Sequence, residues 1–285
     1  MSVRPHTVTR RKPVSPKRVS MYFLLVALTI VFLFPMEWMI AASFRPTQYV
    51  MYNVNSWRSL LPIPFTLANY KDIFTQEPFL MFLATSIGYV VVIIPISLLV
   101  NGMAAYALAR LRFPGRGMLT NFIIALIIIP FEAILLPLYL EMAQFGMINT
   151  YWAMIMPFLV NPLIIFLLRQ FFLALPRELE ESASLDGASV WRTFWSIIVP
   201  NSKPAVFAAA FLIFLDRWND FLWPFISTTS QRYWNVQVGL ATFFTQQAQW
   251  GNVMAAAFTI TIPVYIMFVF FQRYLVEGIA TTGIK

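Results

Sequence analysis

Six apolar stretches, each long enough to cross a lipid bilayer as a helix, constrain this chain more than any other feature of its sequence. They cover about residues 21–43, 79–108, 118–141, 151–173, 204–226 and 252–273. About 20 mostly apolar residues span the hydrocarbon core of a bilayer. Backbone polar groups in lipid must be satisfied within the chain, and helices satisfy them. The sequence therefore predicts an all-α membrane protein with six transmembrane helices.

The composition agrees with a membrane bundle and excludes several kinds of chemistry. Charged residues make up 11% of the chain, whereas about 25% is usual in a water-soluble domain. There is no cysteine, which excludes disulfides, thiolate metal ligands and cysteine nucleophiles. The only histidine, His6, lies in the basic N-terminal segment, so histidine-based catalysis within the membrane is excluded. The stretch 21–43 is longer than the roughly 7–15 apolar residues of a cleaved signal, so we expect it to be retained.

Basic residues are distributed unequally between the two sides of the expected bundle. If the N-terminus is cytoplasmic, 15 of the 20 Lys and Arg residues lie inside. The residues outside are Arg45, Arg58, Lys71 and Arg232, and Arg217 lies within the fifth stretch. Such a bias predicts that both termini are cytoplasmic. The expected organisation is a basic N-terminal tail (1–20), a six-span domain (21–273) and a C-terminal tail (274–285).

The inner loop 174–203 has the pattern of a two-helix hairpin. Pro176 and the carboxylates that follow it, Glu178 among them, mark the start of a short helix. Asp186-Gly187 is a turn signal. A second short helix is expected at about 188–197, with Pro200 breaking it before the fifth stretch. The alternative is an ordinary amphipathic loop that rests on the membrane surface.

The same loop resembles a known family signature, Glu-x-Ala-x-x-x-Gly followed after nine residues by Ile-x-x-Pro. Here these positions are Glu181, Ala183, Gly187, Ile197 and Pro200. The pattern is similar to that of permease subunits of binding-protein-dependent ATP-driven importers, in which alanine and leucine stand where this chain has Ser182 and Val199. The resemblance implies that the loop docks on a cytoplasmic ATP-binding subunit and transmits its motion to the membrane helices. The residues it assigns to this coupling are Glu180, Glu181, Ser182, Ala183, Asp186, Gly187, Ala188 and Pro200.

Three further stretches resemble the carbohydrate-uptake branch of that family, of the maltose and glycerol-3-phosphate type. They are the turn 109–116, the segment 218–224 and the segment 272–278; residues 281–285 look like the end of the shorter of two paired permeases. The resemblance implies a second, non-identical permease, two ATP-binding subunits, an extracytoplasmic substrate-binding protein and a prokaryotic inner membrane. The chain has no Gly-x-x-x-x-Gly-Lys-[Ser/Thr] loop. We therefore expect no cofactor on this chain, ATP and Mg²⁺ in partner subunits, no enzyme activity of its own and no nucleic-acid partner.

The fifth stretch carries charges that are costly inside a membrane. On a continuous helix, Asp216, Asn219 and Asp220 would share one face beside Arg217. One hypothesis places them on a substrate path, since carboxylates and amides bind hydroxyl groups and tryptophan stacks on sugar rings. The other hypothesis is an Asp–Arg network that only packs helices. Glu132 in the third stretch could likewise face a substrate path or only pack helices. The candidate path residues are Glu132, Asp216, Trp218, Asn219, Asp220 and Trp223.

The outer loop 227–251 is rich in aromatic and amide side chains. Tyr233, Trp234, Gln246 and Trp250 are candidates for contact with the binding protein. An interfacial aromatic belt would explain most of these residues equally well.

The function expected from these features is import of a sugar, oligosaccharide or polyol phosphate, with ATP-subunit closure coupled to alternating access. An ion-gradient-driven secondary transporter is the alternative. Such folds usually show inverted repeats and midplane carboxylates; Asp216, Asp220 and Glu132 could serve an ion, but no repeat is visible. A membrane-embedded enzyme is disfavoured, since the expected spans hold neither cysteine nor histidine.

Overall fold

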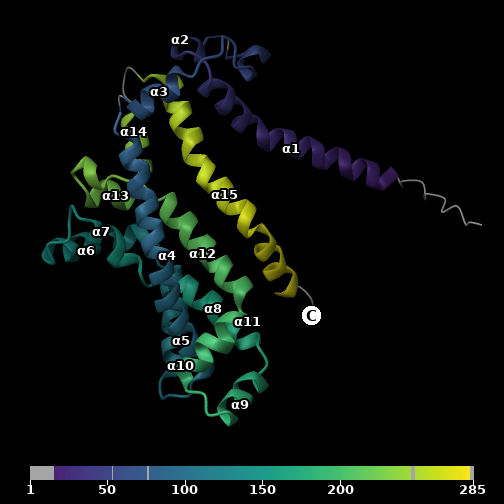
Figure 1. Ribbon diagram of the computed structural model, residues 1–285, viewed down its shortest axis with the longest axis vertical. Coiled ribbons are helices and arrows are strands. Elements are labelled where there is room, and N and C mark those ends of the chain that lie inside the picture. The colour runs from purple at the N-terminus through teal and green to yellow at the C-terminus, as the bar shows by residue number, and fades with distance from the viewer. Residues whose placement is uncertain (1–15, 53, 76, 245–247, 283–285) are drawn as a thin grey trace, which may run out of the picture.

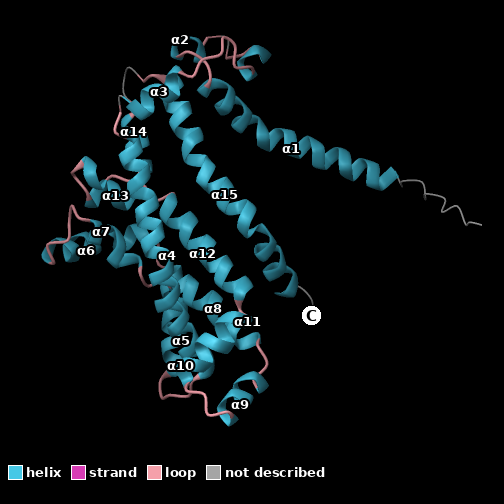
Figure 2. Ribbon diagram, in the orientation of Figure 1, coloured by secondary structure: helices cyan, strands magenta, loops and turns pink. Residues whose placement is uncertain are grey.

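The computed structural model describes residues 16–52, 54–75, 77–244 and 248–282, with the side chains of residues 16 and 275–282 left out. Every regular element within those residues is helical (Figures 1 and 2). The α-helices are α1 (Pro16–Ser43), α2 (Thr47–Val50), α3 (Ala68–Thr75), α4 (Phe79–Arg110), α5 (Arg116–Ile128), α6 (Phe131–Gln144), α7 (Tyr151–Ile155), α8 (Pro162–Ala174), α9 (Glu178–Leu185), α10 (Val190–Thr193), α11 (Val199–Asn201), α12 (Lys203–Trp218), α13 (Leu222–Ser227), α14 (Val236–Thr242) and α15 (Trp250–Thr282). Short η segments are η1 (Trp57–Leu60), η2 (Met156–Phe158), η3 (Phe194–Ile198) and η4 (Gln231–Tyr233), of which η3 is a π-helix. The all-α fold class is confirmed.

Three helices in the described part of the chain, α1, α4 and α15, are long and apolar enough to cross a membrane unbroken. Three further pairs reach that length only together, and each pair is bent. The bends are 103° between α5 and α6, 42° between the α7–η2 segment and α8, and 84° between the 190–201 segment and α12. If each bent pair is one span, the chain has up to six.

The bend between α5 and α6 follows from proline chemistry. Pro130 is the residue before α6, and Ile129 before it has an extended backbone with ψ 118°. The proline ring clashes with a helical conformation at the preceding residue, so α5 ends there. Glu132, two residues after Pro130, lies in the first turn of α6. The positive end of the helix dipole favours negative charge at this position.

The expected helix 204–226 is interrupted, which corrects the helix-face argument. α12 ends at Trp218, and Asn219 (φ −91°, ψ 0°) has left the helix. Two side-chain hydrogen bonds favour the break: Asn219 Nδ2 donates to the Leu215 carbonyl at 2.8 Å, and Asp220 Oδ1 accepts from the Trp223 backbone N–H at 3.3 Å. Such local bonds compete with helical ones. Asp216, Asn219 and Asp220 therefore do not lie on one continuous helix face.

The core is built around α4, which runs along most of the bundle with α8 and α12 beside it and α15 packed on α12 (Figure 1). One buried cluster includes Ile93, Leu168 and Phe194, and a second includes Val90 and Trp218. Burial of apolar side chains contributes about 25 cal/mol per Å² removed from water, although a membrane lowers that gain for surfaces that would otherwise contact lipid. The bundle is therefore held by two buried clusters, to both of which α4 contributes.

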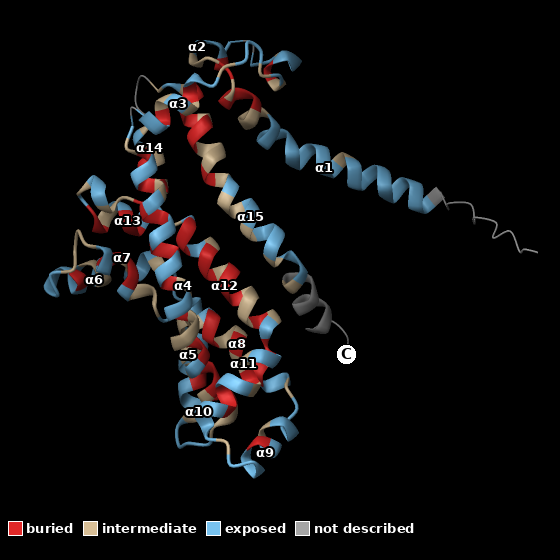
Figure 3. Ribbon diagram, viewed as in Figure 1, coloured by how far each residue is buried: buried red, intermediate tan, exposed pale blue. Residues whose placement is uncertain are grey.

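The helix α1 leaves the bundle. Its last turn is buried, with Ala41 and Ala42 almost inaccessible, and the rest of its length is exposed (Figure 3). Its exposed side chains are nearly all apolar. Such a surface requires lipid or another protein to cover it.

Helices extend into the ranges of both expected tails. α1 already begins at Pro16, so residues 16–20 are helical, and α15 continues through Thr282. Residues 1–15, which include His6, and residues 283–285 lie outside the described residues.

Candidate coupling hairpin and polar cavity

The hairpin at residues 178–201 begins with α9, and a glycine ends that helix. Gly187 has φ +72°, a left-handed conformation that costs other residues about 1–2 kcal/mol. Its N–H donates to the Ser184 carbonyl at 3.1 Å, and the Ala188 N–H donates to the Ala183 carbonyl at 2.9 Å. This pair of bonds is a Schellman motif, which satisfies carbonyls that the helix end leaves free. The Asp186-Gly187 turn is therefore confirmed.

The second arm of the hairpin is longer than expected. Ser189 Oγ accepts from the Arg192 N–H at 3.3 Å and starts α10, and the chain remains helical through η3 and α11 to Asn201. Pro200 lies inside this segment, so the prediction that it breaks the helix is wrong. The π-helical turn before it loosens the backbone ladder, and Asn201 Nδ2 donates to the Ile197 carbonyl at 2.7 Å. The direction changes instead after Ser202, where α12 begins.

The candidate coupling residues divide by exposure. Glu181, Ser182, Asp186, Gly187 and Pro200 are exposed, Ala188 is half-buried and Ala183 is buried within the chain. Beside them Leu185 is 89% exposed, and the sequence had not singled it out. A large apolar side chain this exposed at the tip of a polar hairpin is suited to contact with a partner surface.

Glu180 faces inward and binds Arg110, a contact that the sequence reasoning missed. Arg110 Nε lies 3.0 Å from Glu180 Oε1, and the Arg110 side chain is almost completely buried. Its Nη2 also donates to the backbone carbonyls of Leu175, at 2.6 Å, and Phe172. One guanidinium thus joins the end of α4, the end of α8 and the start of α9. The only sequence signal was the basic turn at 109–116.

Two neighbouring arginines stabilise the same junction between α4, α8 and α9. Arg116 donates to the carbonyls of Ala109 at 2.9 Å and Leu111 at 3.2 Å, and Arg169 donates to that of Leu108 at 3.3 Å. Basic side chains at a helix C-terminus satisfy free carbonyls and interact favourably with the helix dipole. The end of α4 that meets the hairpin is therefore strongly fixed.

Aromatic packing attaches the second arm to α4. The Phe194 ring is buried, lies 5.4 Å from the Tyr106 ring and packs beside Gly102. Trp191 and Trp195, on the same arm, are more than two-fifths exposed. Phe194 is therefore the main anchor of this arm.

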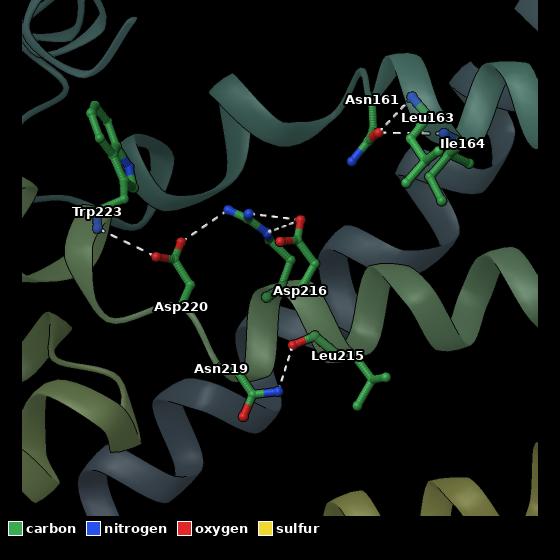
Figure 4. A network of polar contacts seen from close by, with 9 residues as sticks. Asn161, Leu163, Ile164, Leu215, Asp216, Asn219, Asp220 and Trp223 are labelled. Atoms are coloured by element: carbon green, nitrogen blue, oxygen red, sulfur yellow. Dashed lines mark hydrogen bonds and ion pairs between the residues drawn. The ribbon is translucent and has the colours of Figure 1, made fainter. Parts of the chain in front are cut away.

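A cavity of about 840 Å³ lies beside the break between α12 and α13. It brings together Glu132, Asp216, Asn219 and Asp220, four of the predicted path residues. Asn161, which caps α8 by accepting from the N–H groups of Leu163 and Ile164, also lines it (Figure 4). Its volume lies in the range of about 300–1,000 Å³ typical of small-molecule sites.

Arg217 is the centre of the polar network in this cavity. Its Nη2 lies 2.8 Å from Asp216 Oδ2 and its Nη1 3.0 Å from Asp220 Oδ2 (Figure 4). Its Cζ lies 3.7 Å from the centre of the Phe158 ring, within the distance of a cation–π contact. The Asp–Arg network of the packing hypothesis is thus present, and it also lines the cavity, so the two hypotheses are compatible.

The two tryptophans of the predicted path do not reach the cavity. Trp218 and Trp223 are 1% and 0% exposed. Their Nε1 atoms donate to the carbonyls of Ile260 at 3.2 Å and Ala153 at 2.8 Å. Tertiary packing buries both rings in this conformation, and both indole donors have backbone partners. Whether the rings contact a solute stays a prediction.

Three predicted contact residues of the loop 227–251, Tyr233, Trp234 and Trp250, are half-buried and pack against other aromatic rings. The Tyr233 ring lies 4.9 Å from that of Tyr151, Trp234 lies 5.9 Å from Phe82, and Trp250 lies 6.0 Å from Phe244. Gln246 lies outside the described residues. These contacts fix the aromatic side chains in place; whether they contact a binding protein stays a prediction.

The fold, a hairpin projecting from an apolar helical bundle, and the polar cavity within it define a membrane transport protein. A family model described as "Binding-protein-dependent transport system inner membrane component" matches residues 101–281. The chain belongs to this family. Its members are transport components rather than enzymes, and membership does not favour the ion-gradient alternative.

Individual relatives match over nearly the whole chain. The chain is 36% identical to an arabinooligosaccharides transport system permease protein of Halalkalibacterium halodurans, over 88% of this chain and 91% of the relative. It is 32% identical to a trehalose/maltose transport system permease protein of Thermococcus litoralis, over 94% and 97% respectively. A bacterial ABC transporter involved in alginate import has the same fold, with a TM-score of 0.83 at 23% identity over 93% of this chain and 99% of that one.

Proposed function

We propose that this chain forms half of the translocation pathway of an ATP-driven importer for a sugar or oligosaccharide. The observation that carries the proposal is the polar cavity next to Arg217, Asp216 and Asp220 within an otherwise apolar bundle. Carboxylates and amides that face a cavity suit the hydroxyl groups of a carbohydrate. The relatives named for arabino-oligosaccharide and trehalose/maltose transport support this solute class. A polyol phosphate, the second candidate solute, suits the cavity less well, because the positive charge of Arg217 is already paired with Asp216 and Asp220.

The hairpin couples the pathway to ATP-binding subunits in this proposal. Glu181 and Leu185 are exposed at its tip and face a partner. Glu180 and Phe194 attach it to the end of α4. The Glu180 ion pair and the Phe194 ring contact hold the hairpin firmly on α4. Motion of a docked subunit therefore moves α4 and α8 rather than deforming the loop. ATP and Mg²⁺ act in those subunits, and this chain binds no cofactor.

The proposed assembly contains a second, non-identical permease, two ATP-binding subunits and an extracytoplasmic binding protein. Both termini face the cytoplasm, as the unequal distribution of basic residues favours. In this orientation the 178–201 hairpin is cytoplasmic, and the 44–67 and 228–249 connections face outward. The exposed apolar length of α1 supports a further membrane partner.

Transport by the complete assembly in proteoliposomes tests the function. We expect uptake of an oligosaccharide to require ATP and the binding protein, with no response to a proton or sodium gradient alone. Uptake driven by an ion gradient without ATP-binding subunits would contradict the proposal. Uptake of glycerol phosphate in preference to neutral sugars would instead select the polyol-phosphate candidate.

Hairpin variants test the coupling role separately. Glu181→Lys reverses a charge at the exposed tip, so we expect solute-stimulated ATPase activity to fall while the isolated chain keeps its melting temperature. Glu178→Lys, an exposed change in the first turn of the same helix, is the matched control and should have a smaller effect. Equal ATPase activity in wild type and Glu181→Lys would contradict docking through this tip.

A further inference from the structure

A second cavity lies in the connection between α1 and α3, far along the chain from the residues of the polar network. Its volume is about 410 Å³. Two arginines, Arg45 and Arg58, line it together with the aromatic side chains of Tyr49, Tyr52 and Trp57. A cavity of this size holds a small ligand or part of a larger one. Its lining has two positive charges and no carboxylate.

Arg45 is a buried charge without an adequate partner among the residues that the structure describes. The residue is 4% exposed, and its Nε and Nη1 atoms are buried with no hydrogen-bond acceptor. Nη2 makes one long contact, 3.5 Å to the Tyr52 carbonyl. None of the ion pairs recorded among the described residues includes it, and burial lowers the pKa of its guanidinium. Buried charges without a counter-charge are strongly unfavourable, so the site requires an anion from outside the chain.

The position of the cavity indicates where that anion comes from. Arg45 follows the last residue of α1, Ser43, by two positions, and α1 is long enough to cross the membrane. The cavity therefore lies at the depth of the lipid headgroups. Around it Trp57, Ile63 and Phe65 are each more than three-fifths exposed. Exposed aromatic and aliphatic side chains at this depth are typical of the membrane–water interface.

We propose that this cavity binds a phosphate group, supplied by the headgroup of a phospholipid in the adjacent leaflet. Arg45 has two nitrogen atoms without an acceptor, and its planar guanidinium matches phosphate geometry. Arg58 adds a second positive charge at the exposed edge. The aromatic rings cover the glycerol region, and the exposed apolar side chains contact the acyl chains. Basic pockets beside membrane helices bind anionic headgroups in this way.

Native mass spectrometry of the assembled transporter in mild detergent tests the site, with phosphatidylglycerol as the probe. We expect Arg45→Gln to weaken phosphatidylglycerol binding at one site by about tenfold, or about 1.4 kcal/mol, because the variant loses a charge-assisted hydrogen bond to the phosphate. Arg58→Gln, an exposed change, should weaken it less. Lys71→Gln is the matched control: it removes an exposed positive charge from α3 in the same part of the chain and should leave binding unchanged.

Further measurements distinguish the possible sources of the anion. Inorganic phosphate at millimolar concentration should not displace the lipid from the wild type; displacement would mean a free-anion site and overturn the lipid assignment. Unchanged lipid binding in both arginine variants would also overturn it. If those variants keep the lipid and instead lose affinity for the binding protein, a partner carboxylate fills the cavity. Arg45→Lys retains the charge and should bind phosphatidylglycerol better than Arg45→Gln does. If the Arg45 variants fail to fold, weaker lipid binding in Arg58→Gln supports the proposal, and unchanged binding in Arg58→Gln contradicts it.

Discussion

At the scale of single residues, a few side chains decide how the hairpin is held, and Arg110 is the clearest. From the end of α4 it pairs with a carboxylate on α9 and donates to two backbone carbonyls at the end of α8. A buried guanidinium with several partners is expensive to remove, because each partner loses its counter-group at once. Gly187 has a comparable role through its backbone alone, since only glycine adopts its conformation without strain.

Arg110→Gln should destabilise the protein by about 2–4 kcal/mol, because it leaves Glu180 and two carbonyls without a charged donor. The measurement is the thermal melting of the purified chain in detergent, together with ATPase coupling in the assembly. Arg112→Gln is the matched control, an exposed arginine two residues away. Equal losses in the two variants would show that general charge, rather than this ion pair, matters.

Gly187→Ala should lower stability by about 1–2 kcal/mol because an alanine must adopt φ +72°. No atom lies within 4 Å of the added Cβ, so the cost is conformational rather than steric. Gly117→Ala is the control: it also has open space around the added Cβ but lies inside α5, where alanine is favoured by about 0.5–1 kcal/mol. Opposite shifts in melting temperature are therefore expected, and a loss at both positions would contradict this account.

At the scale of elements, the break between α12 and α13 positions the polar cavity. Asp220 has two tasks there: it pairs with Arg217 and accepts from the Trp223 N–H. Asp216 pairs with the same arginine from the end of α12. The two carboxylates differ in environment, since the Asp216 side chain is 52% exposed and that of Asp220 only 10%.

Asp220→Asn should therefore impair transport and stability more than Asp216→Asn. Exposed ion pairs contribute about 0–1 kcal/mol, whereas breaking a buried pair costs about 3–5 kcal/mol. Melting temperature and solute uptake of the two variants, compared in the same assembly, provide the measurement. An equal or larger effect of Asp216→Asn would show that direct solute contact by the exposed carboxylate outweighs its role in the network.

The contact between α14 and α4 offers a purely steric prediction. A Cβ on Gly239 would lie 2.1 Å from Phe82 Cδ2, closer than atoms can approach without displacement. We expect Gly239→Ala to cost about 1–3 kcal/mol, as overpacking usually does. The double variant Gly239→Ala/Phe82→Leu should recover part of the loss in a melting experiment. A double variant no better than additive would mean that another contact limits this packing.

At the scale of the whole molecule, two of the exposed apolar surfaces in the described part of the chain lie on elements that are far apart, α1 and α9 (Figure 1). One is the length of α1 and the other is Leu185 at the hairpin tip. A chain without cysteine allows a spin label to be placed at each in turn. A label at residue 185 should lose mobility when ATP-binding subunits are added, and a label at residue 32 on α1 should not. Immobilisation at 32 alone would place the ATP-binding subunits elsewhere.

Local patterns in the sequence were sufficient for the membrane class, the all-α fold and the turn at Gly187. The hydropathy of about 20 consecutive residues indicates a membrane span, and a single glycine after a helix indicates a left-handed turn. Both features depend only on residues adjacent in the sequence, so both can be predicted without the fold. The start and end of α9 can be predicted in the same way, because Pro176 and Gly187 restrict the backbone conformation next to them.

Only the tertiary structure decided which charged and aromatic side chains face inward. It pairs Arg110 with Glu180, 70 positions away in the chain, and buries Trp218 and Trp223 through bonds to Ile260 and Ala153. It also ends α12 at Trp218, where the sequence predicted a continuous helix to 226. The ion pair and the burial of both tryptophans depend on contacts between distant segments, about which periodicity within one segment carries no information. The end of α12 is favoured instead by local bonds of Asn219 and Asp220, which hydropathy does not reveal.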